Sequence, residues 1–299
     1  MSDYLTDARV AKEKLDIVSD SFCLAKWKQV SLHLTTGHTN SCYHPPLHKI
    51  PTGPLLDNPS ALHNTEHKKQ SRREMMAGTK CTDCNYCWNI EAQDNISDRH
   101  YRSGERWAMD SFDDIVKNPE ADVNPSYVEV NFNNVCNLSC SYCSPQFSST
   151  WTQESKKLGA WPTTTPHNDP EHFVGDRRAI PNREDNPYKE AFWRWWPDLY
   201  KDLKHFRMTG GEPTMDPNTY RVFDYVLENP KLDLHLNTTS NFSVEEKIWQ
   251  KYKSYVQRLC EGQQIEHFMQ FVSLDTWGSQ AEYIRHGLDF DLAINRCEE

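Results

Sequence analysis

The chain has 299 residues, enough to bury one large or two ordinary hydrophobic cores. Asp and Glu outnumber Lys and Arg by 43 to 33, which disfavours a general nucleic-acid surface. The first ten residues, MSDYLTDARV, carry acids and no apolar run, and no stretch reaches membrane-spanning length. We therefore expect a cytoplasmic protein without a membrane or nucleic-acid partner, whose ten cysteines are thiols or metal ligands rather than disulfides.

A cysteine-rich module is predicted over residues 1–109. The alternation in VSLHL and a following glycine predict a β-hairpin between Cys23 and Cys42. Good helix formers predict a helix over residues 63–77, which leads to the segment CTDCNYC with its cysteines Cys81, Cys84 and Cys87. A hairpin followed by C-x2-C is how zinc ribbons are built, and an iron-sulfur cluster takes the same donors.

Residues 110–125 are charged and end in the turn-forming sequence NPEADVNP, so a linker between two modules is predicted there. The second module covers residues 126–299 and opens with the alternating strand SYVEVNF. The loop after this strand places three thiols within eight positions, at Cys136, Cys140 and Cys143. Such close thiols cannot all form disulfides without strain and suit a soft metal centre, either a zinc knuckle or an iron-sulfur cluster.

The C-x3-C-x2-C spacing, with Tyr142 directly before the last cysteine, resembles the cysteine motif of the radical S-adenosylmethionine (SAM) enzymes. The resemblance implies that Cys136, Cys140 and Cys143 hold a 4Fe-4S cluster whose open iron is chelated by the amino and carboxylate groups of SAM. One electron from the cluster would then split the sulfonium and give a 5'-deoxyadenosyl radical, which abstracts hydrogen from a substrate. The resemblance also implies an external one-electron donor such as a flavodoxin or ferredoxin.

The N-terminal cysteines follow the pattern C-x13-G-x4-C and then C-x2-C, which resembles the SPASM and twitch modules of radical SAM enzymes. Those modules carry auxiliary iron-sulfur clusters. The resemblance implies an auxiliary 4Fe-4S cluster on Cys23, Cys42, Cys81 and Cys84, with Cys87 as an alternate ligand or a packed thiol. Two features depart from the family, because this module precedes the core and its C-x2-C-x2-C run is tighter than the SPASM pattern.

Residues 144–188 are rich in proline and polar residues and lack periodicity, so a long loop is predicted there. Substrate lid, partner contact and surface insertion are its possible roles. A helix is expected over residues 186–204, whose apolar face packs on the sheet through Trp193, Trp196, Leu199 and Leu203.

A short strand that begins near residue 205 ends in Gly210 and Gly211, followed by Glu212 and Pro213. Glycines let the backbone approach a ligand without an intervening Cβ, and a carboxylate accepts a hydrogen bond from an ammonium group. In its position after the cysteine loop, this segment resembles the G-G-E-P motif of radical SAM enzymes, which contacts the amino group of SAM.

A third strand is expected near residue 232 and a fourth near residue 268. A helix over residues 218–228 is expected before the third strand, and a helix over residues 244–260 before the fourth. The third strand ends in Ser240 and Asn241, where the family has a T-N-G segment. After the fourth strand, Ser273, Asp275 and Arg285 resemble the S-[IL]-D...R pattern of peptide-modifying radical SAM proteins. There the serine and arginine lie by the ribose and carboxylate of SAM.

The expected fold is therefore α/β. A small cysteine-rich α+β module precedes a partial (β/α)6 TIM-like radical SAM barrel, which the sequence follows through about four of its six strands. We expect either a truncated product or a second polypeptide that supplies the remaining strands.

These motifs predict a radical SAM enzyme. A peptide or protein side chain is the leading substrate, and a sugar, nucleotide or other small molecule is the rival. A different class stays open: a non-enzymatic zinc-binding or iron-sulfur electron-transfer protein, which has the cysteines and does not cleave SAM.

Overall fold

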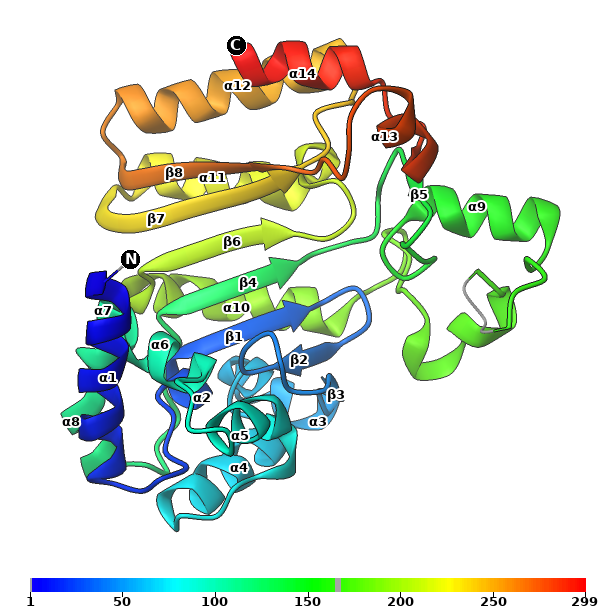
Figure 1. Cartoon of the computed structure of the whole chain (residues 1–299). Coiled ribbons are helices and arrows are strands. Elements are labelled where there is room, and N and C mark those ends of the chain that lie inside the picture. Colours follow the sequence, from blue (N-terminus) through cyan, green and yellow to red (C-terminus); the bar gives the residue numbers. More distant parts are fainter. Residues whose placement is uncertain (1, 165–167) are drawn as a thin grey trace. The chain divides into compact units, whose positions relative to one another are not determined.

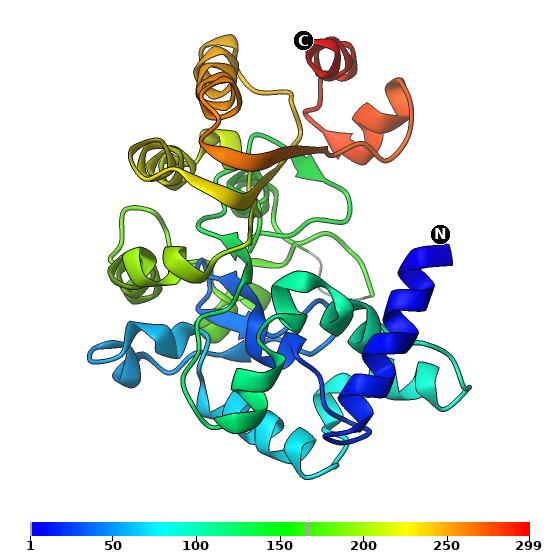
Figure 2. The same cartoon turned by 90° about the vertical axis from the view of Figure 1, so that its left-hand side faces the viewer.

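A computed structural model describes residues 2–164 and 168–299 (Figures 1 and 2). Contacts divide the chain into two compact units. Unit 1 comprises Met1–Leu32, Gly37–Val128 and Pro187–His205; unit 2 comprises His33–Thr36, Glu129–Asn186 and Phe206–Glu299. In the described part of the chain, no helix combines the length and apolar character that crossing a membrane requires.

Unit 1 is mainly helical. Its elements are α1 (Ser2–Asp16), α2 (Ala25–Lys28), β1 (Gln29–His33), β2 (His38–Asn40), β3 (His48–Lys49), α3 (Thr52–Leu55), η1 (Pro59–Leu62), α4 (Glu66–Met76), η2 (Thr82–Cys84), α5 (Asn85–Glu91), α6 (Asp98–Gly104), α7 (Arg106–Met109), α8 (Phe112–Lys117) and α10 (Pro187–Asp202). Figure 1 shows α1 beside α6, with which it packs. The predicted hairpin is confirmed as neighbouring strands β1 and β2, and the predicted helix before the CTDCNYC segment is confirmed as α4.

Unit 2 contains most of each strand of the second module; Tyr127, Val128 and His205 at the starts of β4 and β6 belong to unit 1. Its elements are β4 (Tyr127–Asn131), β5 (Ser139–Cys140), α9 (Ser149–Leu158), η3 (Pro170–Phe173), η4 (Gly175–Arg177), β6 (His205–Thr209), η5 (Pro213–Met215), α11 (Pro217–Glu228), β7 (Lys231–Ser240), α12 (Glu246–Glu261), β8 (Ile265–Val272), α13 (Ser279–Ile284), β9 (Arg285–His286) and α14 (Phe290–Glu298). Figure 2 shows α11 and α12 end-on beside β7 and β8. Aromatic contact between Phe223 and Phe268 joins α11 to β8.

The strands form a mostly parallel seven-stranded sheet in the order β3-β2-β1-β4-β6-β7-β8, so the chain has a mixed α/β fold. The four strands expected from the sequence are confirmed as β4, β6, β7 and β8, and they neighbour one another in chain order. The parallel register of β7 and β8 places Ser240 opposite Val272 at their carboxyl ends. Strand β5 pairs antiparallel with β9 in a separate two-stranded sheet.

Two segments predicted to be irregular each contain a helix. The expected linker over residues 110–125 contains helix α8, which folds because Phe112 and Ile115 are buried in the core of unit 1. The expected loop over residues 144–188 contains helix α9, where the Ser148 hydroxyl caps the backbone N–H of Trp151 and the Trp151 ring is fully buried. The part of that predicted loop at residues 165–167 lies outside the described residues.

Candidate metal centres

The cysteine loop, residues 133–145, is held by the first turn of α9. Ser149 accepts a hydrogen bond from the backbone N–H of Cys136 at 3.1 Å, and the Ser149 N–H donates to the carbonyl of Asn134 at 2.7 Å. The Trp151 indole N–H donates to the carbonyl of Cys140 at 2.8 Å. These bonds satisfy backbone groups that an irregular loop would otherwise leave open. Helix α9 therefore positions Cys136 and Cys140.

The Gly-Gly turn after β6 closes against the same loop. The Glu212 N–H donates to the carbonyl of Val135 at 2.6 Å. Gly210 and Gly211 both have positive φ, at 76° and 54°. A Cβ on Gly211 would come within 2.6 Å of the Val135 carbonyl oxygen, and one on Gly210 would overlap the Asn131 side chain. The glycines thus permit the turn to approach the protein's own cysteine loop.

We expect Gly211→Ala to lower the free energy of unfolding by about 2 kcal/mol or more, because left-handed strain costs about 1–2 kcal/mol and overlap with backbone adds to it. Gly78→Ala is the matched control. Gly78 has a similar φ of 75°, yet a Cβ there would meet atoms only at 3.9 Å and beyond. Urea unfolding of both variants separates strain from overlap, and equal losses in the two would contradict this account.

Glu212 is buried, with 2% of its surface exposed. One carboxylate oxygen accepts from the backbone and hydroxyl of Thr214, at 3.1 and 2.7 Å, and from the Ser240 hydroxyl at 2.7 Å. The other accepts from the backbone N–H of Asn241 at 2.9 Å. Burial raises the pKa of Glu212, and these donors act against that shift. The carboxylate therefore ties the turn after β6 to the end of β7.

One pocket of unit 2, with a volume of ≈250 Å³, is lined by residues from several of the sequence motifs. We call it the motif pocket. Its lining includes the three clustered thiols and the predicted residues of three later segments: Cys136, Cys140, Tyr142, Cys143, Gly210, Gly211, Glu212, Ser273 and Arg285. Thr239 and Ser240 at the end of β7, and Asn241 directly after it, also line the pocket. Asp275 contacts two lining residues, and Pro213 is buried at the start of η5.

Arg285 is a cation that lines the motif pocket beside the clustered thiols. Its guanidinium lies 2.7 Å from the Asp275 carboxylate, 3.9 Å from the Cys140 sulfur and 5.4 Å from the centre of the Tyr142 ring. Tyr142 in turn donates to Asp275 at 3.0 Å. The antiparallel pairing of β9 with β5 sets Arg285 opposite Cys140. The sequence motif signalled the arginine, and the strand pairing that delivers it had no sequence signal.

Without a bound metal, burial favours the protonated form of the motif-pocket thiols at neutral pH. Burial raises the pKa of Cys136 to about 12 and that of Cys143 to about 11. Burial also raises the pKa of Cys140, and the Arg285 charge acts against that shift. Because metals bind thiolates, loading a metal here must release protons. Three thiols line this pocket, and thiols are the donors that iron-sulfur clusters take.

Sequence reasoning missed Asn137, which lies in the cysteine loop. Its side chain donates to the carbonyl of Ser243 at 2.7 Å and accepts from the Asn241 amide at 3.0 Å. These contacts join the loop to the segment after β7. The amide gave no signal in the sequence because its partners lie more than a hundred positions later in the chain.

The five cysteines of unit 1, which we call the N-terminal thiol cluster, also come together. Cys23, Cys42, Cys84 and Cys87 line one small pocket of ≈20 Å³, and Cys81 is hydrogen-bonded to Cys84. That bond lowers the pKa of Cys81 and raises the pKa of Cys84. The pocket thus contains Cys87, which the sequence pattern ranked as an alternate. Thiols are the donors of metal-thiolate centres. Ligands of a four-iron cluster are thiolates, so the hydrogen bond between Cys81 and Cys84 would have to break when a cluster is loaded.

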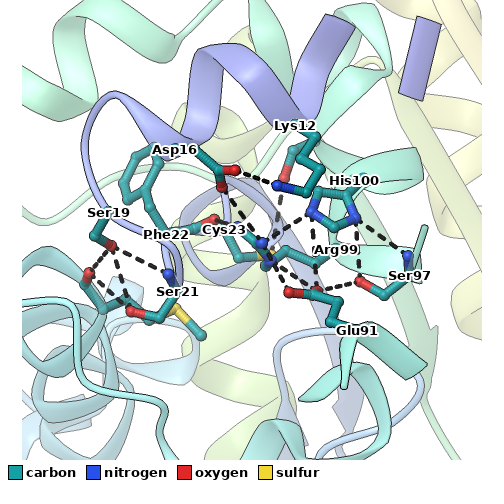
Figure 3. A network of polar contacts seen from close by, with 12 residues as sticks. Lys12, Asp16, Ser19, Ser21, Phe22, Cys23, Glu91, Ser97, Arg99 and His100 are labelled. Carbon is teal, nitrogen blue, oxygen red and sulfur yellow. Dashed lines mark hydrogen bonds and ion pairs between the residues drawn. The ribbon is translucent and has the colours of Figure 1, made fainter. Parts of the chain in front are cut away.

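A polar network supports this cluster at Cys23 (Figure 3). Arg99 is buried and pairs with Glu91 through two hydrogen bonds of 3.0 and 2.9 Å, and it also donates to the carbonyl of Phe22 at 2.9 Å. The Ser103 hydroxyl lies 3.8 Å from the Cys23 sulfur. Burial raises the pKa of Cys23, against which the Arg99 charge acts. The network fixes the side of the cluster formed by Cys23.

Within residues 2–164 and 168–299, no group of three or more His, Cys, Asp or Glu side chains is placed so that it could hold a metal ion. Comparison with known proteins found no matching family model, no matching curated protein and no matching solved structure.

Proposed function

We propose that this chain is a radical SAM enzyme with an auxiliary iron-sulfur cluster, built on the first part of a partial (β/α)6 barrel. The observation that carries the proposal is the convergence of four motifs from separate parts of the sequence on one pocket, the motif pocket. Chance similarity at any one motif would not bring the others to the same place.

Cys136, Cys140 and Cys143 would hold a 4Fe-4S cluster, and Arg285 and Ser273 would bind the carboxylate and ribose of SAM. Once bound and reduced by the external donor, the cluster would supply the one electron that cleaves the sulfonium of SAM to methionine and a 5'-deoxyadenosyl radical. The backbone of Gly210 and Gly211 would face the amino end of SAM. Because both carboxylate oxygens of Glu212 already accept hydrogen bonds within the protein, we assign Glu212 the task of positioning Ser240 and Asn241.

Polar residues lead away from the motif pocket along one face of the sheet. Glu129 alternates with the buried Val128 and Val130, and its carboxylate lies 3.4 Å from the Arg207 guanidinium. Arg207 donates to Thr239, which lines the motif pocket, at 3.2 Å. We place the substrate on this face. Its charged and hydroxyl groups suit a peptide or protein side chain, the leading substrate class, with an external flavodoxin or ferredoxin as electron donor; a polar small molecule is the rival.

The proposal is tested by anaerobic purification, followed by iron, sulfide and zinc analysis and by electron paramagnetic resonance of the reduced protein with and without SAM. We expect about eight irons per chain and a signal that changes with SAM, as two four-iron clusters with one open site would give. Zinc in place of iron, with no response to SAM, would assign the chain to the non-enzymatic zinc-binding class.

Arg285→Gln is expected to weaken SAM binding about 10-fold to 100-fold, because a hydrogen bond to a charged group is worth about 1.5–3 kcal/mol. Arg258→Gln on α12 is the control, since Arg258 stacks on Tyr255 and lines no part of the motif pocket. Equilibrium dialysis with labelled SAM measures both variants. Unchanged affinity in Arg285→Gln would remove Arg285 from the site.

A further inference from the structure

Lys26 on α2 is a buried cation, with 3% of its surface exposed, and it lines the same pocket as Cys23, Cys42, Cys84 and Cys87. Its nearest carboxylate, that of Asp83, lies 4.0 Å from the ammonium nitrogen. Asp83 is also bonded to His67 at 2.7 Å. An ammonium group taken out of water costs several kcal/mol unless an opposite charge compensates it. Asp83 compensates Lys26 only in part.

Other buried cations lie in the same unit. Lys68 and Arg72 are each 1% exposed. The Lys68 ammonium donates to the Thr39 hydroxyl at 2.8 Å and lies 3.5 Å from His63, both neutral groups. Arg72 bonds to neutral partners in the same way, the Asn64 amide oxygen among them. Unit 1 therefore buries several basic side chains whose hydrogen-bond partners are neutral groups.

The thiols are the groups that can balance the Lys26 charge, because Lys26 lines one pocket with Cys23, Cys42, Cys84 and Cys87. Arg99 and Arg102 line the same pocket, but Arg99 is already paired with the Glu91 carboxylate at 2.9 Å. Four thiolates around a metal or an iron-sulfur cluster carry net negative charge. A buried cation beside such a set stabilises it, and more so after an electron is added.

We propose that Lys26 is the counter-charge of the metal-thiolate centre in the N-terminal thiol cluster and a positioning residue that raises the reduction potential of the auxiliary iron-sulfur cluster. This inference rests on the proposed function, which supplies the cluster. The residue acts through its fixed positive charge beside the cysteine sulfurs.

Lys26→Met tests the inference, because methionine keeps the length of the side chain and removes the charge. In a spectroscopic redox titration of the anaerobic full chain, we expect the auxiliary cluster to be at least tenfold harder to reduce, a shift of about 59 mV to lower potential for one electron. Lys26→Arg should stay near the wild-type potential. Lys28→Met is the matched control, since Lys28 lies on the same helix and is buried, yet bonds to the carbonyl of Asn124.

A second readout uses the metal-free protein. With iron removed by a chelator, Lys26→Met should be as stable as the wild type or more stable, because the cost of burying an uncompensated charge is gone. If Lys26→Met does not fold, Lys26→Gln replaces it and its cluster must show the same lower potential.

The failures of the two proposals are distinguishable. A wild-type chain with about four irons and no second cluster signal, or with zinc in the N-terminal thiol cluster, refutes the auxiliary cluster and this inference with it. A wild-type chain with two clusters, whose auxiliary potential is the same in Lys26→Met and Lys28→Met, overturns only the role of Lys26.

Discussion

Cys140→Ala is expected to remove about half of the iron from the anaerobically purified chain, about four of about eight atoms, and to abolish the spectral response to SAM. Cys140 lies between Cys136 and Cys143 in sequence, opposite Arg285 in the β5–β9 pairing, and lines the motif pocket. Two remaining cysteines cannot hold a cubane that needs three protein ligands. SAM cleavage, measured as 5'-deoxyadenosine, should be lost with the cluster.

Two further variants localise the effect. Cys260→Ala changes an exposed thiol on α12 and should retain all of the iron. The triple variant Cys81→Ala, Cys84→Ala, Cys87→Ala leaves two thiols in the N-terminal thiol cluster, and it should lose the other half of the iron and keep the spectral response to SAM. If Cys140→Ala kept its full iron content and its SAM response, Cys140 would not be a ligand and the motif pocket would not be the SAM site.

Strands were the part of the fold that local pattern predicted best. In β4, Val128 and Val130 are fully buried and alternate with Glu129, so a period of two was visible in the sequence. Helix α8 was missed because it is only six residues long and its buried residues, Phe112 and Ile115, stand beside two aspartates. Helix α9 was missed because its stability comes from one capping serine and one buried tryptophan rather than from a repeated apolar face.

Motifs predicted which residues line the candidate site. What each residue does there depends on contacts with distant parts of the chain, which a motif does not contain. Glu212 was interpreted as an acceptor for an ammonium group, whereas its oxygens are held by Thr214, Ser240 and Asn241. Local sequence cannot report a bond between a turn and a strand end 28 positions later. The same reason hides Lys26, whose relation to Cys81 and Cys84 depends on how α2 and η2 pack.

Glu212→Ala is expected to lower the free energy of unfolding by about 3–5 kcal/mol, because removal of one partner from a buried charged network leaves the others unpaired. The orphaned donors would be two groups of Thr214, the Ser240 hydroxyl and the Asn241 N–H. Urea unfolding measures the loss. Glu228→Ala, at the exposed end of α11, should change stability by no more than about 0.5 kcal/mol.

Glu212→Gln separates the positioning role from a ligand role. Glutamine keeps one acceptor and places an N–H2 group against a donor, so an intermediate loss of stability is expected if the carboxylate serves the fold. Under conditions where this variant is folded, we expect its SAM affinity to fall only as far as Ser240 and Asn241 are displaced. A variant as stable as the wild type that has lost SAM binding would show instead that the carboxylate contacts SAM directly, as the motif first suggested.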